Sequence, residues 1–135
     1  ALGSILPLLR SPSGLVFLAY LPEEATRSLV ERELMYSSRY TISPSTPKSF
    51  AEVRRVAKEV RSAGFAINNV DISPGLRSVA CPILDLQRNI VAVVSLTGPD
   101  STLGPEHPAL HDLVAVCRRL SEEAGYRAAS EIAIT

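Results

Sequence analysis

Two long β-type segments, joined by a short polar turn, constrain the fold of this chain more than any other feature. Residues 75–85 read Gly-Leu-Arg-Ser-Val-Ala-Cys-Pro-Ile-Leu-Asp, and residues 90–98 read Ile-Val-Ala-Val-Val-Ser-Leu-Thr-Gly. Both are rich in β-branched and apolar residues, and the turn between them is Asp-Leu-Gln-Arg-Asn. This pattern predicts two adjacent antiparallel strands.

Small hydroxyl side chains lie on both predicted strands. Ser95 and Thr97 are two residues apart, so they share one face of their strand, and Ser78 adds a hydroxyl on the preceding strand. A sheet face that sets hydroxyls among Val, Ala and Leu is either a half-hydrated surface or the wall of a small-molecule pocket. The sequence leaves both readings open at this point.

Length, charge and cysteine content limit the class of protein. The 135 residues suffice for one domain with a sizeable core, and the formal net charge of zero argues against binding nucleic acid through bulk charge, although a separate domain could do so. No apolar run is long enough to cross a bilayer. Cys81 and Cys117 lie in apolar runs without metal-type spacing, which predicts buried thiols in a reducing cytoplasm. Because the chain begins with Ala1 in strand-like sequence, we interpret it as a fragment of a longer protein.

Capping signals and helical spacing assign the remaining elements. Ser11 followed by Pro12 is typical of a helix start, Ser49 and Glu52 form a capping box, and Gly64 is a typical helix stop. In chain order we expect a strand at 4–9, helices at 12–21, 22–35 and 50–63, strands at 65–69, 76–84 and 90–96, and a helix at 106–124 whose buried face comprises Leu110, Leu113, Val114, Cys117 and Leu120.

This order predicts an α+β fold in which helices cover one face of a three-stranded antiparallel sheet. The other face then lacks cover, which suggests further strands from a missing N-terminal segment or from a partner chain. We therefore expect self-association. Arg77 and the outward face of residues 76–84 are the first candidates for the contact.

The sequence offers little catalytic or metal-binding chemistry. The acidic pairs at 23–24, 31–33 and 122–123 diverge on helices and are interpreted as solvated faces. His107 and His111 have no obvious third ligand, and the Ser13 region lacks the first glycine and the base of a nucleophile elbow. We predict no catalytic residue, no metal and no cofactor. The helix start at Ser13 is either simply capped by Ser11 or, in addition, a seat for a carboxylate.

Several segments, taken together, resemble a known family. These are residues 6–22 (Leu-Pro-Leu-Leu-Arg-Ser-Pro-Ser-Gly-Leu-Val-Phe-Leu-Ala-Tyr-Leu-Pro), 60–65, 75–85, 91–99 and 121–126. In order and spacing they resemble the C-terminal effector-binding domain of IclR-type bacterial transcription regulators. The resemblance covers nearly the whole chain, although no one motif decides it.

The resemblance implies a GAF-like, profilin-like sensor fold, here lacking its first strands. It also implies a cytoplasmic homodimer or homotetramer that binds DNA through a separate N-terminal winged helix-turn-helix absent from this chain. The family pocket, which takes a small-molecule effector such as a carboxylic acid, falls on Pro12, Ser13, Asn68, Leu76, Ser78, Ser95 and Thr97. The chain departs from the family pattern at Leu15, at Asn68 and at Val70.

The implied function is ligand sensing within a repressor or activator of transcription, without enzymatic activity. Two other functions remain open. One is a GAF-like regulatory or oligomerisation module of a signalling enzyme, and the other is a small enzyme acting on an acyl or hydroxy-acid substrate. The first would require a signalling domain upstream, and the second a base close to one of the pocket hydroxyls.

Overall fold

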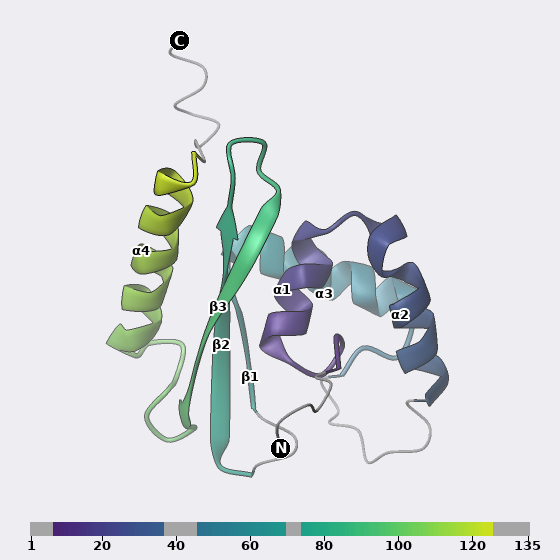
Figure 1. Cartoon of the computed structure of the whole chain (residues 1–135). Helices are drawn as coiled ribbons and strands as arrows, with labels where there is room; N and C mark the ends of the chain where they lie inside the picture. The colour runs from purple at the N-terminus through teal and green to yellow at the C-terminus, as the bar shows by residue number, and fades with distance from the viewer. Residues whose placement is uncertain (1–6, 37–45, 70–73, 126–135) are drawn as a thin grey trace, which may run out of the picture.

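The structure, a computed structural model, describes residues 7–36, 46–69 and 74–125 (Figure 1). Its elements are, in order, α1 (Pro12–Tyr20), α2 (Glu23–Tyr36), α3 (Phe50–Ala63), β1 (Ala66–Asn69), β2 (Leu76–Leu84), β3 (Ile90–Pro99) and α4 (Pro108–Glu123). The α+β class and all of these elements follow the expected order. The strand expected at 4–9 is wrong where it can be checked, because residues 8–10 form a turn, and residues 1–6 lie outside the described residues.

The three strands form an antiparallel sheet in the order β1-β2-β3. Asn68 pairs with Ser78, and Ser78 pairs with Thr97 on the other side. Strand β3 continues three residues beyond its expected end, since Leu76 pairs with Pro99. In the connecting turn, an Asp85 carboxylate oxygen accepts the backbone N–H groups of Gln87 and Asn89, each at 2.9 Å. These bonds explain why a short polar segment suffices to close the hairpin.

Helices cover both faces of the sheet, which corrects the expectation of one covered face. Figure 1 shows α4 on one side of the sheet and α1 with α3 on the other. The middle strand shows the consequence, because Val79 and Ala80 point to opposite faces and both are fully buried. A near-continuous apolar run such as that in β2 is typical of a strand buried on both sides.

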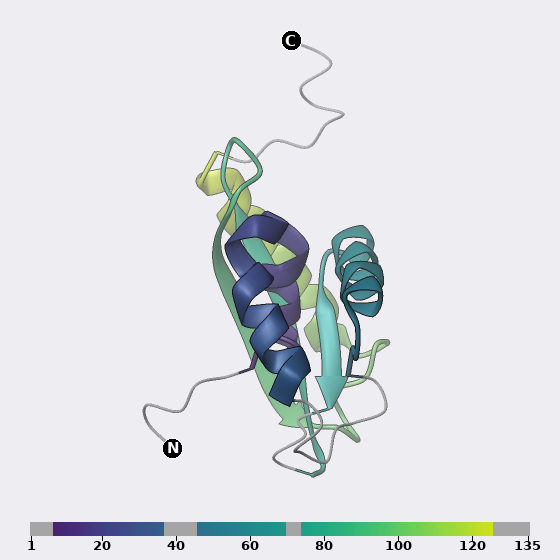
Figure 2. The same ribbon diagram turned by 90° about the vertical axis from the view of Figure 1, so that its right-hand side faces the viewer.

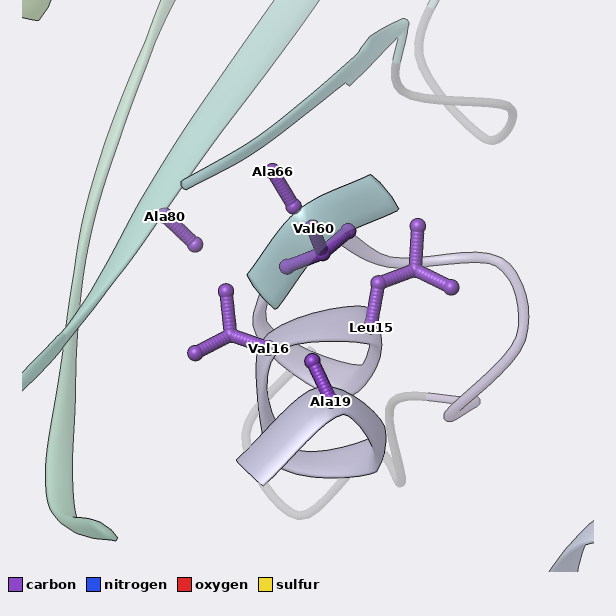
Figure 3. Packing of buried hydrophobic residues seen from close by; sticks show 6 residues of the cluster. All are labelled: Leu15, Val16, Ala19, Val60, Ala66 and Ala80. Carbon is purple, nitrogen blue, oxygen red and sulfur yellow. The ribbon is translucent and has the colours of Figure 1, made fainter. Parts of the chain in front are cut away.

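Small side chains pack between α1 and the sheet (Figure 3). Val16 and Ala80 are fully buried, and Ala19 is almost fully buried. Val60 of α3 and Ala66 of β1 complete the cluster. Because most of these residues are alanine or valine, the helix axis can come close to the sheet, and apolar contact area holds α1 against the strands.

The α4 face combines apolar packing with buried polar groups. Val79 packs with Leu103 and Leu110 there. Ser121, which is 4% exposed, accepts the Leu84 N–H at 3.0 Å and donates to the Cys117 carbonyl at 2.8 Å. Leu120, which we expected to be buried, is 38% exposed. The helix turns Ser121 inward instead, where its hydroxyl satisfies a backbone group of β2.

Helix α3 lies alongside α1 and next to β1, and α2 lies farther from the sheet than α1 (Figures 1 and 2). Leu9, Val30 and Val53 form a small core between them and the turn that precedes α1. Each helix boundary here has a local cause. Ser49 caps α3 by accepting the Glu52 N–H at 3.3 Å, and Gly64 ends it with a φ of +82°.

Candidate functional site

The site begins at the N-terminus of α1. The Ser11 hydroxyl accepts the Gly14 N–H at 3.0 Å and donates to the Pro7 carbonyl at 2.8 Å. Pro12 has no N–H, and the Leu15 N–H is bonded to the Ser11 carbonyl. No hydrogen bond from the Ser13 N–H to the described residues is found, and this group lies in the first turn of α1, at the positive end of the helix dipole.

Gly14 sets the position of this helix start. A Cβ at Gly14 would lie 2.4 Å from the Leu8 carbonyl oxygen, so only glycine allows the turn before α1 to pass so close. Glu33 of α2 holds the same turn, because its two carboxylate oxygens accept the N–H groups of Leu8 and Leu9 at 2.6 and 2.9 Å. Glu33 therefore has a structural role, which corrects its interpretation as part of a solvated acidic pair.

A row of polar side chains crosses the sheet on the same face as α1. Ala80 packs against α1, so Ser78, two residues earlier, points to the same side. The register then places Asn68 on one side of Ser78 and Thr97 on the other. The hydroxyls of Ser78 and Thr97 lie 2.8 Å apart, and Ser78 also donates to the Leu96 carbonyl at 3.4 Å. Three strands thus contribute one continuous polar row.

The expected site residues divide into three positions. Pro12 and Ser13 lie at the start of α1, where Pro12 is buried and Ser13 is half-buried. Asn68, Ser78 and Thr97 form the row across the sheet. Leu76 and Ser95 flank the row on the same face, Leu76 at the start of β2 and Ser95 opposite Ala80, and both are exposed.

The register therefore brings together all five strand residues of the expected site, and the row is buried at its middle, half-buried at Asn68 and exposed at Thr97. Ser78 is 9% exposed, whereas Thr97 on the edge strand is exposed. Asn68 also borders a cavity of about 410 Å³ between α3 and β1. Val70 and Asp71, where the chain departs from the family pattern, lie outside the described residues.

The residues weighed for other chemistry lie away from this row. His107 caps α4, where its Nδ1 accepts the Ala109 N–H at 3.1 Å. Neither Ser78 nor Thr97 has a hydrogen bond to a carboxylate or an imidazole among residues 7–36, 46–69 and 74–125. In the same part of the chain, no three His, Cys, Asp or Glu side chains gather as a metal site.

The two cysteines lie next to each other between β2 and α4, both buried and free. Burial raises the pKa of the Cys81 thiol to about 12, and the neighbouring Cys117 contributes to the increase. The pKa of Cys117 is raised by burial as well. Both thiols are therefore protonated and unreactive at neutral pH, as the expectation of buried thiols implied.

Arg77 lies on the α4 side of the sheet and not at an open surface. Its Nη1 donates to the Leu103 carbonyl at 3.1 Å, which fastens the β3–α4 connection to β2. The outward face of β2 is buried under α4, since Val79 and Cys81 are at most 1% exposed. Arg77 and this face are therefore unavailable as the first contact between subunits, which corrects that expectation.

Sequence reasoning missed two further long-range contacts. Arg61 of α3 donates through Nε and Nη2 to the Ala19 carbonyl and so caps the end of α1, with its guanidinium 5.9 Å from the centre of the Tyr20 ring. Arg54 binds Glu23 through two bonds of 2.8 and 3.2 Å. This bond from Arg54 holds the pKa of the Glu23 carboxyl below its usual value, and Arg27 adds to the effect. No local pattern in the sequence reveals such pairings.

The arrangement of helices and sheet is that of a known regulator domain. The family described as "Bacterial transcriptional regulator IclR C-terminal" matches residues 1–123. The chain belongs to this family. The family is one of transcriptional regulators and not of enzymes, as expected from the sequence.

Two curated relatives show how far the similarity to other IclR-family proteins extends. The HTH-type transcriptional repressor AllR of Klebsiella pneumoniae is 34% identical over 106 residues, which are 78% of this chain and 37% of AllR. The transcriptional repressor IclR of Escherichia coli (strain K12) is 28% identical over 102 residues, which are 76% of this chain and 36% of that protein. The chain thus spans little more than a third of the length of these two relatives.

Solved structures of IclR-family regulators share the fold. Pseudomonas aeruginosa HmgR superposes with a TM-score of 0.76 at 31% identity, covering 95% of this chain and 49% of that chain. The C-terminal domain of the E. coli transcriptional regulator KdgR gives a TM-score of 0.66 at 26% identity, covering 89% of this chain and 72% of that chain. The resemblance inferred from the sequence is confirmed, and so is the α+β fold with helices flanking an antiparallel sheet.

One further finding concerns membranes. Among the described residues, no helix combines the length and the apolar character that a membrane span requires.

Proposed function

We propose that this chain is the effector-binding domain of an IclR-family transcription regulator and that it binds a small organic carboxylate on the α1 face of the sheet. The observation that carries the proposal is the polar row of Asn68, Ser78 and Thr97 on the face that α1 covers. A carboxylate there could accept the Ser13 N–H. It could also accept the Thr97 hydroxyl proton once Ser78 turns its own proton from the Leu96 carbonyl to the Thr97 oxygen. Pro12 and Leu76 would provide apolar contacts, and Ser95 would contact the part of the ligand closest to the sheet edge.

Effector binding should change DNA binding through the other parts of the intact protein. We propose that the intact protein carries an N-terminal winged helix-turn-helix, as expected from the family resemblance, and that effector binding changes how subunits are placed. A coupling of about 1–3 kcal/mol is typical of such regulation. The two free buried thiols fit a reducing cytoplasm.

A screen of aliphatic and aromatic carboxylic acids by thermal shift tests the ligand proposal. A true effector at about 100 times its dissociation constant should stabilise the domain by about 2.7 kcal/mol. Ser78→Ala and Thr97→Val should reduce the shift, whereas Ser101→Ala, at an exposed position in the connection to α4, should leave it unchanged. The proposal fails if no acid raises the melting temperature and Ser95→Leu leaves promoter occupancy by the intact regulator unchanged.

We also propose that the intact protein assembles as a dimer or tetramer through this domain. Large apolar side chains are exposed on β3 and α4, among them Leu96 at 39% and Val116 and Leu120 at 38% each. Exposed apolar surface of this kind commonly marks an interface, and two-fold pairing is the commonest arrangement. Light scattering should show a dimer or larger species that Leu120→Glu disrupts, and a monomeric wild-type protein at micromolar concentration would rule this assembly out.

A further inference from the structure

A second concave site lies between α1, α2 and α3, and no strand residue lines it. Its volume is about 300 Å³, which is at the lower end of the range for small-molecule sites. Its floor is apolar and mostly buried, and includes Ala19 at 1%, Val30 at 2% and Val53 at 8% exposure. Leu18 and Phe50 form half-buried walls. We call this site the helix groove.

Cationic side chains of α3 line one side of the helix groove. Arg54, Lys58 and Arg61 are spaced by four and three residues, so they form a stripe along one face of α3. Arg27 of α2 also lines the groove, and Glu23 is the one carboxylate among the lining residues. Four cations against one carboxylate leave this lining with a net charge of +3.

The charge is unevenly distributed along the groove. Glu23 binds both Arg54 and Arg27, at 2.8 and 3.0 Å, so it neutralises the end of the groove nearest the start of α2. At the other end, Arg61 donates to the Ala19 carbonyl, a bond that leaves its positive charge in place. Lys58 forms no hydrogen bond or ion pair with any residue in the described part of the chain. The uncompensated positive charge therefore lies at the Lys58–Arg61 end.

We propose that the helix groove binds a small amphipathic carboxylate, with its apolar chain on the buried floor and its carboxylate facing Lys58 and Arg61. The volume suits an acyl chain or one aromatic ring and is too small for a peptide helix. The apolar floor disfavours a purely inorganic anion, and the cationic end disfavours a neutral lipid or alcohol. This site is separate from the polar row on the sheet, because none of the residues that line the groove belongs to the row or to any strand.

The test uses the intact protein and octanoate as the probe, with octanol as a neutral molecule of equal chain length. Isothermal titration should detect octanoate, and octanol should bind more weakly. Lys58→Glu should weaken octanoate binding about fivefold or more, since a favourable ion pair becomes a repulsive one. Lys48→Glu is the matched control, because Lys48 is exposed just before α3 and does not line the groove, and it should change the affinity by less than about twofold.

A second variant tests the floor and keeps the charges. Ala57→Leu adds volume at a half-buried position of the groove, so it should reduce binding of octanoate while the melting curve stays cooperative. Ser78→Ala should leave octanoate binding at the groove unchanged, which separates this site from the sheet-face site. The proposal is overturned if octanoate does not bind at concentrations up to about 10 mM. It is also overturned if octanol binds as tightly as octanoate, or if Lys48→Glu and Lys58→Glu weaken octanoate binding equally. Loss of octanoate binding in Ser78→Ala alone would overturn it too.

Discussion

The two faces of the sheet are covered by helices that are held in different ways. On one face, α1 packs against the sheet through small apolar side chains, mostly alanine and valine. On the other, α4 is joined to β2 by the Ser121 hydroxyl and by the two cysteines, and Arg77 fastens the connection that leads into it. The α1 face therefore depends on close fit, whereas the α4 face depends also on buried hydrogen bonds.

This difference suggests that the two faces have different roles, with ligand binding favoured on the α1 face. Polar groups on the α4 face are already bonded within the chain, so little bonding capacity remains there for a ligand. On the α1 face, the polar row begins just beyond the apolar contact, with Thr97 exposed and the Ser13 N–H without a partner among the described residues. The face held by shape is thus the one with polar groups left for binding.

The largest effect is expected from removing the close fit at the start of α1. Gly14→Ala would place a methyl group 2.4 Å from a backbone oxygen of Leu8, and backbone cannot move aside as a flexible side chain can. We expect a loss of about 3 kcal/mol in the free energy of unfolding, measured by urea denaturation. Gly98→Ala is the control, because a Cβ there meets no atom within 4 Å. Equal effects of the two variants would show that α1 is not closely fitted.

Matched core truncations compare the two faces directly. Val16 and Val79 are both 0% exposed, one on the α1 face and one on the α4 face. Each change to alanine should cost about 2 kcal/mol from lost burial and the cavity left behind. If Val79→Ala costs much less than Val16→Ala in chemical denaturation, α4 is less important to the core than its packing indicates.

Removing a hydroxyl group should cost more unfolding free energy on the α4 face than on the α1 face. Ser121→Ala leaves the Leu84 N–H buried without its acceptor, so it should cost about 1–3 kcal/mol. Ser78→Ala should cost less than about 1 kcal/mol, because its partner Thr97 is exposed and can bond to water. Amide hydrogen exchange at Leu84 should accelerate only in the first variant. A larger loss from Ser78→Ala would contradict the contrast between the faces.

The smallest effect concerns pH on the α4 face. Since the pKa of Cys81 is raised in the folded state, its thiol keeps its proton at a pH where the unfolded chain has lost it. The contribution to stability is complete below about pH 9 and should decline as pH rises from there towards 12. The difference in unfolding free energy between wild type and Cys81→Ala should therefore narrow across this range. A difference independent of pH would show that the thiol is accessible to solvent.

Local sequence signals predicted the helices and strands of this fold. The features that they did not predict depend on contacts between residues far apart in the sequence. The Ser11 and Ser49 caps, the Gly64 stop and the hairpin depend on neighbouring residues, and the structure bears them out. The second covered face was missed because the position of α4 depends on how the chain crosses over after β3. Leu120 is exposed and Ser121 is buried for the same reason, since the Ser121 hydroxyl accepts a backbone N–H of β2.

For the candidate site, too, local patterns predicted some residues, and tertiary contacts determined the others. Strand alternation correctly placed Ser95 and Thr97 on one face, and the register added Asn68 and Ser78. The roles of Glu33 and Arg61 could not be found in this way, because the Leu8 N–H that Glu33 accepts is 25 positions away and the Ala19 carbonyl to which Arg61 donates is 42 positions away. Their role depends on the tertiary arrangement and has no local pattern.

The hydrogen bonds to Glu33 connect α2 to the turn before α1, and so to the start of α1 itself. The Glu33 carboxylate accepts the N–H groups of Leu8 and Leu9 in this turn, and α1 approaches the same turn closely at Gly14. A displacement of the α1 start, by a ligand or by a substitution, therefore strains a bond whose other end is on α2, at the outer surface of the molecule. A ligand in the effector site that we propose would therefore act on α2 through Glu33, without any rearrangement of the strands.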